Sequence, residues 1–191
     1  MNKESKTTIA NEESMESRLE QILNDALIKA TDTYSVPPQI IWVDNSTIAT
    51  LGNFSASTGK AKAKKTFNVS ALVAASLSNG TVLNYRACLP EGKRRILYVD
   101  TEQSRYHCHN VLARILKLAG LPTDMDNQNL DFIGLREYTP AIRMEVIDYA
   151  LAHNHGYGLV IIDGIRDLLL DINNAGESVE VINKMMEWSS K

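Results

Sequence analysis

Residues 59–66 read GKAKAKKT, and residues 67–78, which follow directly, read FNVSALVAASLS. The second stretch is rich in Ala, Leu and Val and is followed by Asn79 and Gly80, so it predicts a helix from about Lys65 to Leu77. The first stretch places one glycine, four lysines and a threonine just before that helix. Loop N–H groups and a helix N-terminus attract anions. The arrangement therefore predicts a phosphate-binding loop that opens a helix.

Two alignments of this loop fit the pattern G-x-x-x-x-G-K-[ST] to different degrees. The first uses Gly52, Gly59 and Lys60, but six residues separate its glycines instead of four, and Ala61 stands where a hydroxyl must bind Mg²⁺. The second has the correct spacing, and we prefer it. Its eight positions are Gly59, Lys60, Ala61, Lys62, Ala63, Lys64, Lys65 and Thr66. Lys65 is then expected to contact the β- and γ-phosphates, and the Thr66 hydroxyl to bind Mg²⁺.

The preferred alignment departs from the pattern at one position, where Lys64 replaces the second glycine. If the backbone there is left-handed, a lysine costs roughly 1–2 kcal/mol more than a glycine. The lysine cation offsets part of that cost beside a polyphosphate. We therefore expect nucleotide binding and leave efficient turnover open. The alternative for the whole stretch is a solvated lysine cluster on a surface loop.

Two apolar runs end in acidic residues, as a nucleotide site at the edge of a sheet requires. The run GLVIID ends at Asp163, which is expected to hold the water shell of Mg²⁺. The run ILYVDTE ends at Glu102, which is expected to polarise the attacking water, with Asp100 as the second choice. The alternative for Asp163 is that it only caps a turn at the end of a buried strand. The alternative for Glu102 is that it only begins the next helix.

The rest of the chain alternates predicted strands and amphipathic helices, which is typical of a parallel sheet covered on both faces. The predicted strands are 81–88, 95–100, 131–135 and 159–162. Residues 40–43 form a short apolar run, and residues 47–51 lead into the loop before Gly59. Thr139 followed by Pro140 predicts the start of a helix. The inner face of this helix is predicted to contain Ile142, Val146, Tyr149 and Ala150. The last predicted helix has Val179, Ile182 and Met186 on one face. Residues 1–36 are interpreted as an appendage, disordered to about residue 14 and helical from Met15 to Lys29, before a main domain at 37–191.

Composition limits the classes of function. The formal net charge is −3, so contact with nucleic acid would need a local basic stripe or one assembled by oligomerisation. The two cysteines, Cys88 and Cys108, have no spacing typical of a disulfide framework or a zinc site, which fits a reducing cytoplasm. No apolar run approaches the ~20 residues of a membrane span, so we expect no membrane partner.

The loop, the strand with Glu102 and the strand with Asp163, in this order and spacing, resemble the RecA-like P-loop ATPases. The matching segments GKAKAKKTF, ILYVDTEQS and GLVIIDGIRDLL are most similar to the RepA-type hexameric helicase branch, also called the AAA_25 family. The resemblance covers about residues 45–190. It implies an α/β fold with a RecA-like parallel sheet flanked by helices, and ATP and Mg²⁺ as cofactors. It also implies a homo-oligomeric ring, such as a hexamer, that acts on DNA. Similar proteins serve replication or mobilisation of bacterial plasmids and mobile elements.

The resemblance also implies parts that this sequence does not contain. Family members continue with a strand that inserts between the phosphate-loop strand and the Asp163 strand, and then with strands that carry sensor and arginine-finger groups. We therefore expect either a fragment of a longer protein or a core completed by a partner. The leading hypothesis is an ATPase that works on DNA, with Lys65 and Glu102 as catalytic residues. The alternatives are a nucleotide-sensing module with weak or no catalysis, and a DNA-binding accessory protein without nucleotide.

Overall fold

The computed structural model describes residues 3–60, 63–171 and 173–190, and the chain divides into two compact units at Val36 and Pro37. The first unit contains helix α1 (Lys3–Ala26). The predicted disorder up to residue 14 is therefore wrong from Lys3 onward. The segment has no Gly or Pro, and extending a helix costs much less than nucleating one. The apolar side chains Leu19, Ile22 and Leu23 of α1 are exposed in the structure.

The short strands of the second unit form an antiparallel sheet instead of joining the parallel one. Its strands are β1 (Gln39–Val43), β2 (Ser46–Thr50), β3 (Thr81–Val82) and β4 (Tyr85–Ala87), in the order β2-β1-β4-β3. The predicted strand 81–88 is a hairpin that turns at Leu83, which has a positive φ of 54°. Two-residue connections of this kind return the chain antiparallel to itself, whereas a parallel pair needs a long crossover.

The predicted parallel sheet is confirmed for three strands. These are β5 (Arg95–Asp100), β6 (Leu130–Gly134) and β7 (Tyr157–Asp163), in the order β6-β5-β7. The central strand β5 is buried along nearly its whole length, whereas every residue of β7 is half-buried. In the described part of the chain β7 pairs only with β5, so its second edge carries no partner strand.

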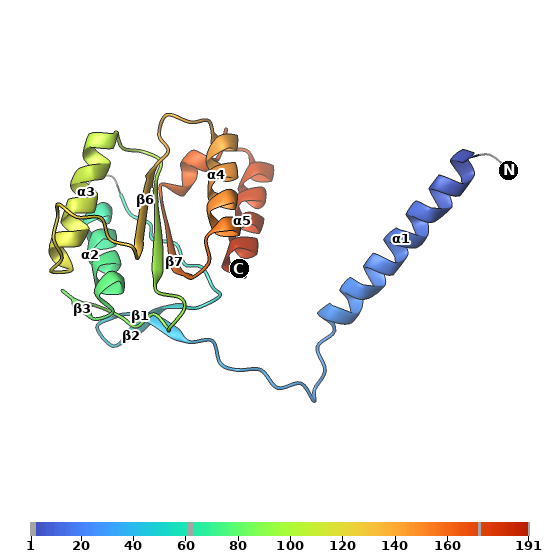
Figure 1. The fold of residues 1–191 in the computed structure, drawn as a ribbon, viewed down its shortest axis with the longest axis horizontal. Helices are drawn as coiled ribbons and strands as arrows, with labels where there is room; N and C mark the ends of the chain where they lie inside the picture. Colours follow the sequence, from blue (N-terminus) through green and yellow to red (C-terminus); the bar gives the residue numbers. More distant parts are fainter. Residues whose placement is uncertain (1–2, 61–62, 172, 191) are drawn as a thin grey trace. The chain divides into compact units, whose positions relative to one another are not determined.

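Helices cover both faces of this sheet (Figure 1). The helices of the second unit are α2 (Lys65–Ser78), α3 (Arg105–Leu118), α4 (Pro140–His153), the 3₁₀ helix η1 (Ile165–Leu168) and α5 (Ala175–Ser189). One core joins Ile96 and Tyr98 of β5 to α2 and α3. The other joins Leu97 and Val99 to α4, η1 and α5. Because side chains of a strand alternate between faces, Asp100 lies on the same face as Tyr98, towards α2 and α3.

The predicted apolar faces of the last two long helices agree only in part with the faces that pack on the sheet. In α4 Val146 and Ala150 pack against the core beside the buried Ile147, as predicted, whereas Ile142 and Tyr149 are exposed. In α5 the residues Val179, Ile182 and Met186 are exposed, and the neighbouring stripe with Val181 and Trp188 is buried instead. Both helices carry apolar residues on more than one face, so periodicity alone does not select the face that packs on the sheet. No helix in the described residues combines the length and the apolar character that crossing a membrane requires.

Candidate functional site

Helix α2 begins without any side chain that caps it. Lys64 occupies the N-cap position in a left-handed conformation, with φ 55° and ψ 30°, and its side chain makes no capping hydrogen bond. The first turn contains no acidic residue. The first N–H groups of a helix have no partner within the helix, and a left-handed residue followed by a right-handed one forms a concave nest of N–H groups. This end of α2 can therefore accept an anion.

The predicted lysines lie along an exposed loop that leads into α2. Lys60, Lys64 and Lys65 are exposed, and Ala63 donates its N–H to the Lys60 carbonyl. The Lys65 ammonium donates to the carbonyl of Gly59 at 3.3 Å, so the lysine curls back over the loop. Two predicted binding residues, Ala61 and Lys62, lie outside the described residues.

The start of α2 lies against the end of β7. Thr66 Oγ1 is 3.4 Å from Asp163 Oδ2, although the two residues are 97 positions apart in the sequence. Strand alternation explains the encounter, because Leu159 and Ile161 of β7 pack in the core under α2 and α3, and Asp163 continues that face. The structure thus brings the threonine hydroxyl and the aspartate carboxylate together.

Glu102 reaches the same edge of the sheet from the neighbouring strand. β5 and β7 run in parallel with Asp100 opposite Asp163, so the residues that follow both strands emerge side by side. Glu102 is exposed, and its carboxylate lies against Gly164, where an added Cβ would come within 2.6 Å of Glu102 Oε1. No described hydrogen bond or ion pair joins Lys65 to Glu102 or Asp163.

Asp100, the second choice for a base, has a different role in the structure. It is fully buried, and Oδ1 accepts the N–H groups of Glu102 and Gln103 at 3.1 and 2.8 Å, while Oδ2 accepts from Gln103 Nε2 at 2.8 Å. Burial raises the pKa of Asp100, and these backbone N–H groups oppose the rise. With its oxygens occupied, Asp100 shapes the turn that presents Glu102.

Thr101 and Tyr98 also contribute to this edge, and the sequence prediction did not include them. The buried Thr101 Oγ1 accepts the Gly164 N–H at 2.9 Å and lies 2.9 Å from Asp167 Oδ2, so it ties the end of β5 to the end of β7. Tyr98 donates its hydroxyl to Asp163 Oδ2 at 3.1 Å. The available signal was the alternation in ILYVD, which puts Tyr98 and Asp100 on one face.

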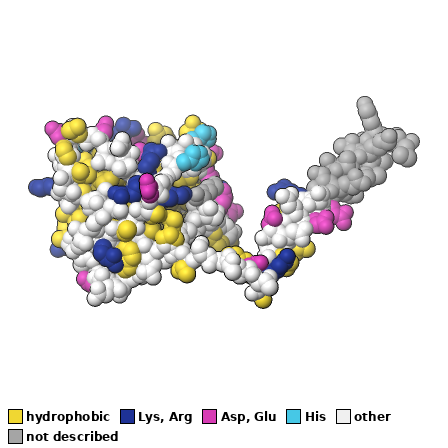
Figure 2. Space-filling model, turned by 60° about the horizontal axis from the view of Figure 1, so that its bottom comes forward, with side chains coloured by type: hydrophobic (Ala, Val, Ile, Leu, Met, Phe, Trp, Pro, Cys, Tyr) yellow, Lys and Arg dark blue, Asp and Glu magenta, His cyan; other side chains and the backbone are white. Residues whose placement is uncertain are grey.

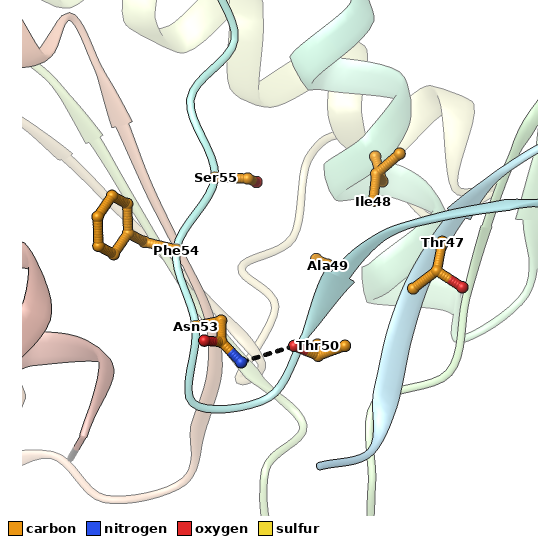
Figure 3. Close-up of a pocket in the computed structure, with 7 residues that line it drawn as sticks. All are labelled: Thr47, Ile48, Ala49, Thr50, Asn53, Phe54 and Ser55. Atoms are coloured by element: carbon orange, nitrogen blue, oxygen red, sulfur yellow. Dashed lines mark hydrogen bonds between the residues drawn. The ribbon is translucent and has the colours of Figure 1, made fainter. Parts of the chain in front are cut away.

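A cavity of about 260 Å³ lies away from this edge (Figure 3). It is lined by β2 and by residues 53–55 of the segment that follows, where Asn53 donates to Thr50 Oγ1 at 2.8 Å. The side chains of Phe54 and Ser55 point to opposite sides of this extended segment (Figure 3). Its lining contains no ionisable side chain, so the cavity offers no charge to a phosphate.

The residues at the strand ends fit a polyphosphate with its metal. Mg²⁺ prefers oxygen ligands, and the Thr66 hydroxyl and the Asp163 carboxylate supply them. The uncapped start of α2, without an acid in its first turn, leaves N–H groups and lysines for phosphate oxygens. Glu102 adds an exposed carboxylate next to these groups.

Comparisons with known proteins agree with this arrangement. Residues 16–189 match a family model that is described as an AAA domain, AAA_25. The match includes the loop, both acidic strand ends and all strands of the two sheets. A search of curated proteins and a search of solved structures gave no significant match.

Proposed function

The chain belongs to the AAA_25 family of AAA domains and is a P-loop ATPase-type domain, and we propose that it binds ATP with Mg²⁺ at residues 59–66 and hydrolyses the β–γ phosphoanhydride. One observation carries the proposal. The hydroxyl of Thr66 lies 3.4 Å from the carboxylate of Asp163 at the uncapped start of α2. A surface lysine cluster has no need of a carboxylate from the end of a half-buried strand, whereas a phosphate loop requires one.

Each residue of the site then has a role that follows from its position. The N–H groups from Gly59 to Thr66 bind phosphate oxygens, and the Lys65 ammonium leaves the Gly59 carbonyl for the β- and γ-phosphates. Thr66 and Asp163 hold Mg²⁺, Asp163 through water, and the metal would supply positive charge that neutralises the phosphate oxygens. Glu102 orients the water that attacks the γ-phosphorus and draws its proton.

The test compares two lysines of the same loop. Lys65→Ala should weaken binding of a fluorescent ATP analogue by about ten- to a hundredfold, which corresponds to a charge-assisted contact of about 1.5–3 kcal/mol. The matched variant Lys60→Ala, which removes the phosphate lysine of the rejected alignment, should weaken it much less. Glu102→Gln should retain binding and lose single-turnover hydrolysis of labelled ATP.

The outcomes separate the alternatives. Hydrolysis that is unchanged by both Lys65→Ala and Glu102→Gln refutes the enzymatic proposal. ATP binding that depends on Lys65, without any hydrolysis, supports a nucleotide-sensing module. The left-handed backbone at Lys64, where the pattern has glycine, favours this alternative. If ATP does not change the melting temperature and Lys65→Ala changes only DNA affinity, the protein is a DNA-binding accessory protein.

We further propose that the domain acts on DNA as a ring-shaped homo-oligomer, as a helicase-like motor in replication or mobilisation of a bacterial plasmid or mobile element. The resemblance to RepA-type helicases supports this. Figure 2 shows Lys and Arg side chains together with Asp and Glu side chains on one face of the molecule. With a net charge of −3, contact with DNA would need a basic stripe that oligomerisation assembles. Arg166, exposed in η1 beyond Asp163, is our candidate for DNA contact. Arg166→Ala should lower single-stranded DNA affinity and its salt dependence without changing ATP affinity.

The free edge of β7 supports a further part of the proposal. An apolar parallel strand with one partner exposes unpaired N–H and C=O groups, and β7 is half-buried along its length. We propose that one more parallel strand, supplied by a partner, pairs with this edge. The β7 amide hydrogens that point away from β5 should therefore exchange fast in the protein alone and slowly when the partner strand is bound.

A further inference from the structure

Tyr98 places its hydroxyl at the proposed metal site from within the core. Its side chain is fully buried, and it lies on the face of β5 that packs against α2 and α3. The ring stacks on Phe132 of β6, with centroids 4.4 Å apart and planes 9° from parallel. A ring held in this way has little rotational freedom to lose, so its hydroxyl is already fixed in position when a ligand arrives.

The Tyr98 hydroxyl and the Thr66 hydroxyl meet one oxygen of Asp163. Tyr98 donates to Oδ2 at 3.1 Å, and Thr66 Oγ1 lies 3.4 Å from the same Oδ2. The Tyr98 phenol is the donor of this hydrogen bond, and the Asp163 carboxylate is its acceptor. A hydrogen bond of this kind fixes the plane of the carboxylate and leaves Oδ1 for another partner.

We propose that Tyr98 is a positioning residue that orients the Asp163 carboxylate for the Mg²⁺ of the bound nucleotide. The inference rests on the proposed function, because it concerns the metal of the same site. In the proposed site Tyr98 would act on the metal only through its hydrogen bond to Asp163. Residues that orient metal ligands in this way typically change metal affinity by about 10–100-fold when they are removed.

The test measures how much Mg²⁺ is needed for tight binding of a non-hydrolysable fluorescent ATP analogue. Tyr98→Phe keeps the ring and its stacking and removes only the hydroxyl. We expect the Mg²⁺ concentration that gives half of the affinity gain to rise about tenfold, while binding in EDTA stays as in the wild type. The matched control is Tyr157→Phe, which removes a tyrosine hydroxyl that donates to Asp131 at the opposite end of the sheet. It should leave the Mg²⁺ dependence unchanged.

A second variant separates positioning from folding. Phe132→Leu removes the stacking partner that holds the Tyr98 ring and keeps the hydroxyl. It should therefore raise the Mg²⁺ requirement severalfold, by less than Tyr98→Phe does. If Tyr98→Phe unfolds, as judged by circular dichroism, a Phe132→Leu protein with wild-type Mg²⁺ dependence overturns the proposal.

The inference and the proposed function can fail separately. If Asp163→Asn raises the Mg²⁺ requirement and folded Tyr98→Phe does not, the role of Tyr98 is refuted and the nucleotide site stands. If the wild type binds no nucleotide at any Mg²⁺ concentration, or if Asp163→Asn has no effect, the proposed function itself is refuted and the role of Tyr98 with it.

Discussion

Replacing Lys64 by glycine should stabilise the protein. Lys64 has φ 55° and ψ 30°, its side chain is exposed, and it makes no capping hydrogen bond at the start of α2. The side chain therefore contributes little to the folded state, while its Cβ strains the left-handed backbone. Left-handed geometry costs a non-glycine residue about 1–2 kcal/mol. Glycine gives back about 0.4–1 kcal/mol through the larger entropy of the unfolded chain. A net gain of about 1 kcal/mol in the free energy of unfolding remains.

Urea unfolding monitored by circular dichroism measures this gain, and a chain of this size should gain about 2–4 °C in melting temperature. Lys64→Ala is the matched variant, because it removes the same charge and keeps the backbone cost. Leu83→Gly tests the backbone argument away from the site, since Leu83 has φ 54° and is 62% exposed. The reasoning is refuted if Lys64→Gly is no more stable than Lys64→Ala.

Two further predictions concern packing and thiol reactivity. Gly158→Ala should lower the free energy of unfolding, measured in urea, by at least about 1–3 kcal/mol, because the new Cβ would lie 2.0 Å from the Lys93 carbonyl oxygen. The control is Gly80→Ala, where the nearest neighbour of the new Cβ is 3.6 Å away, and its loss of stability should be far smaller. Equal losses in the two variants would contradict the packing. Burial raises the pKa of Cys108 to about 11, whereas Cys88 is exposed. Iodoacetamide at pH 8 should therefore alkylate Cys88 and leave Cys108 unmodified until the protein unfolds. If mass spectrometry finds both cysteines modified at similar rates, the burial of Cys108 is contradicted.

Much of the candidate site could be predicted because its signals are local. The spacing from Gly59 to Thr66 and the helix that follows depend only on neighbouring residues, and the structure starts α2 at Lys65. The possible left-handed backbone at Lys64 followed from the glycine that the pattern expects there, and the structure has it. The contact of Tyr98 with Asp163 could not be predicted, because it joins residues 65 positions apart in the sequence and depends on the register of β5 beside β7.

Local order along most of the chain was therefore determined by the sequence alone, except at residues 3–14, which are helical, and at the hairpin of β3 and β4. Some sequence signals depend only on neighbouring residues and favour the same local structure in any fold. They are the apolar runs, the acids at strand ends, and Thr139 with Pro140 at a helix start. The tertiary structure alone decided which sheet the strands up to Ala87 joined and which stripe of α5 was buried. It also decided that Thr66, Tyr98 and Asp163 meet at one carboxylate oxygen. Strand pairing and helix burial depend on partners distant in sequence, and an amphipathic pattern shows that a face is apolar without showing what covers it.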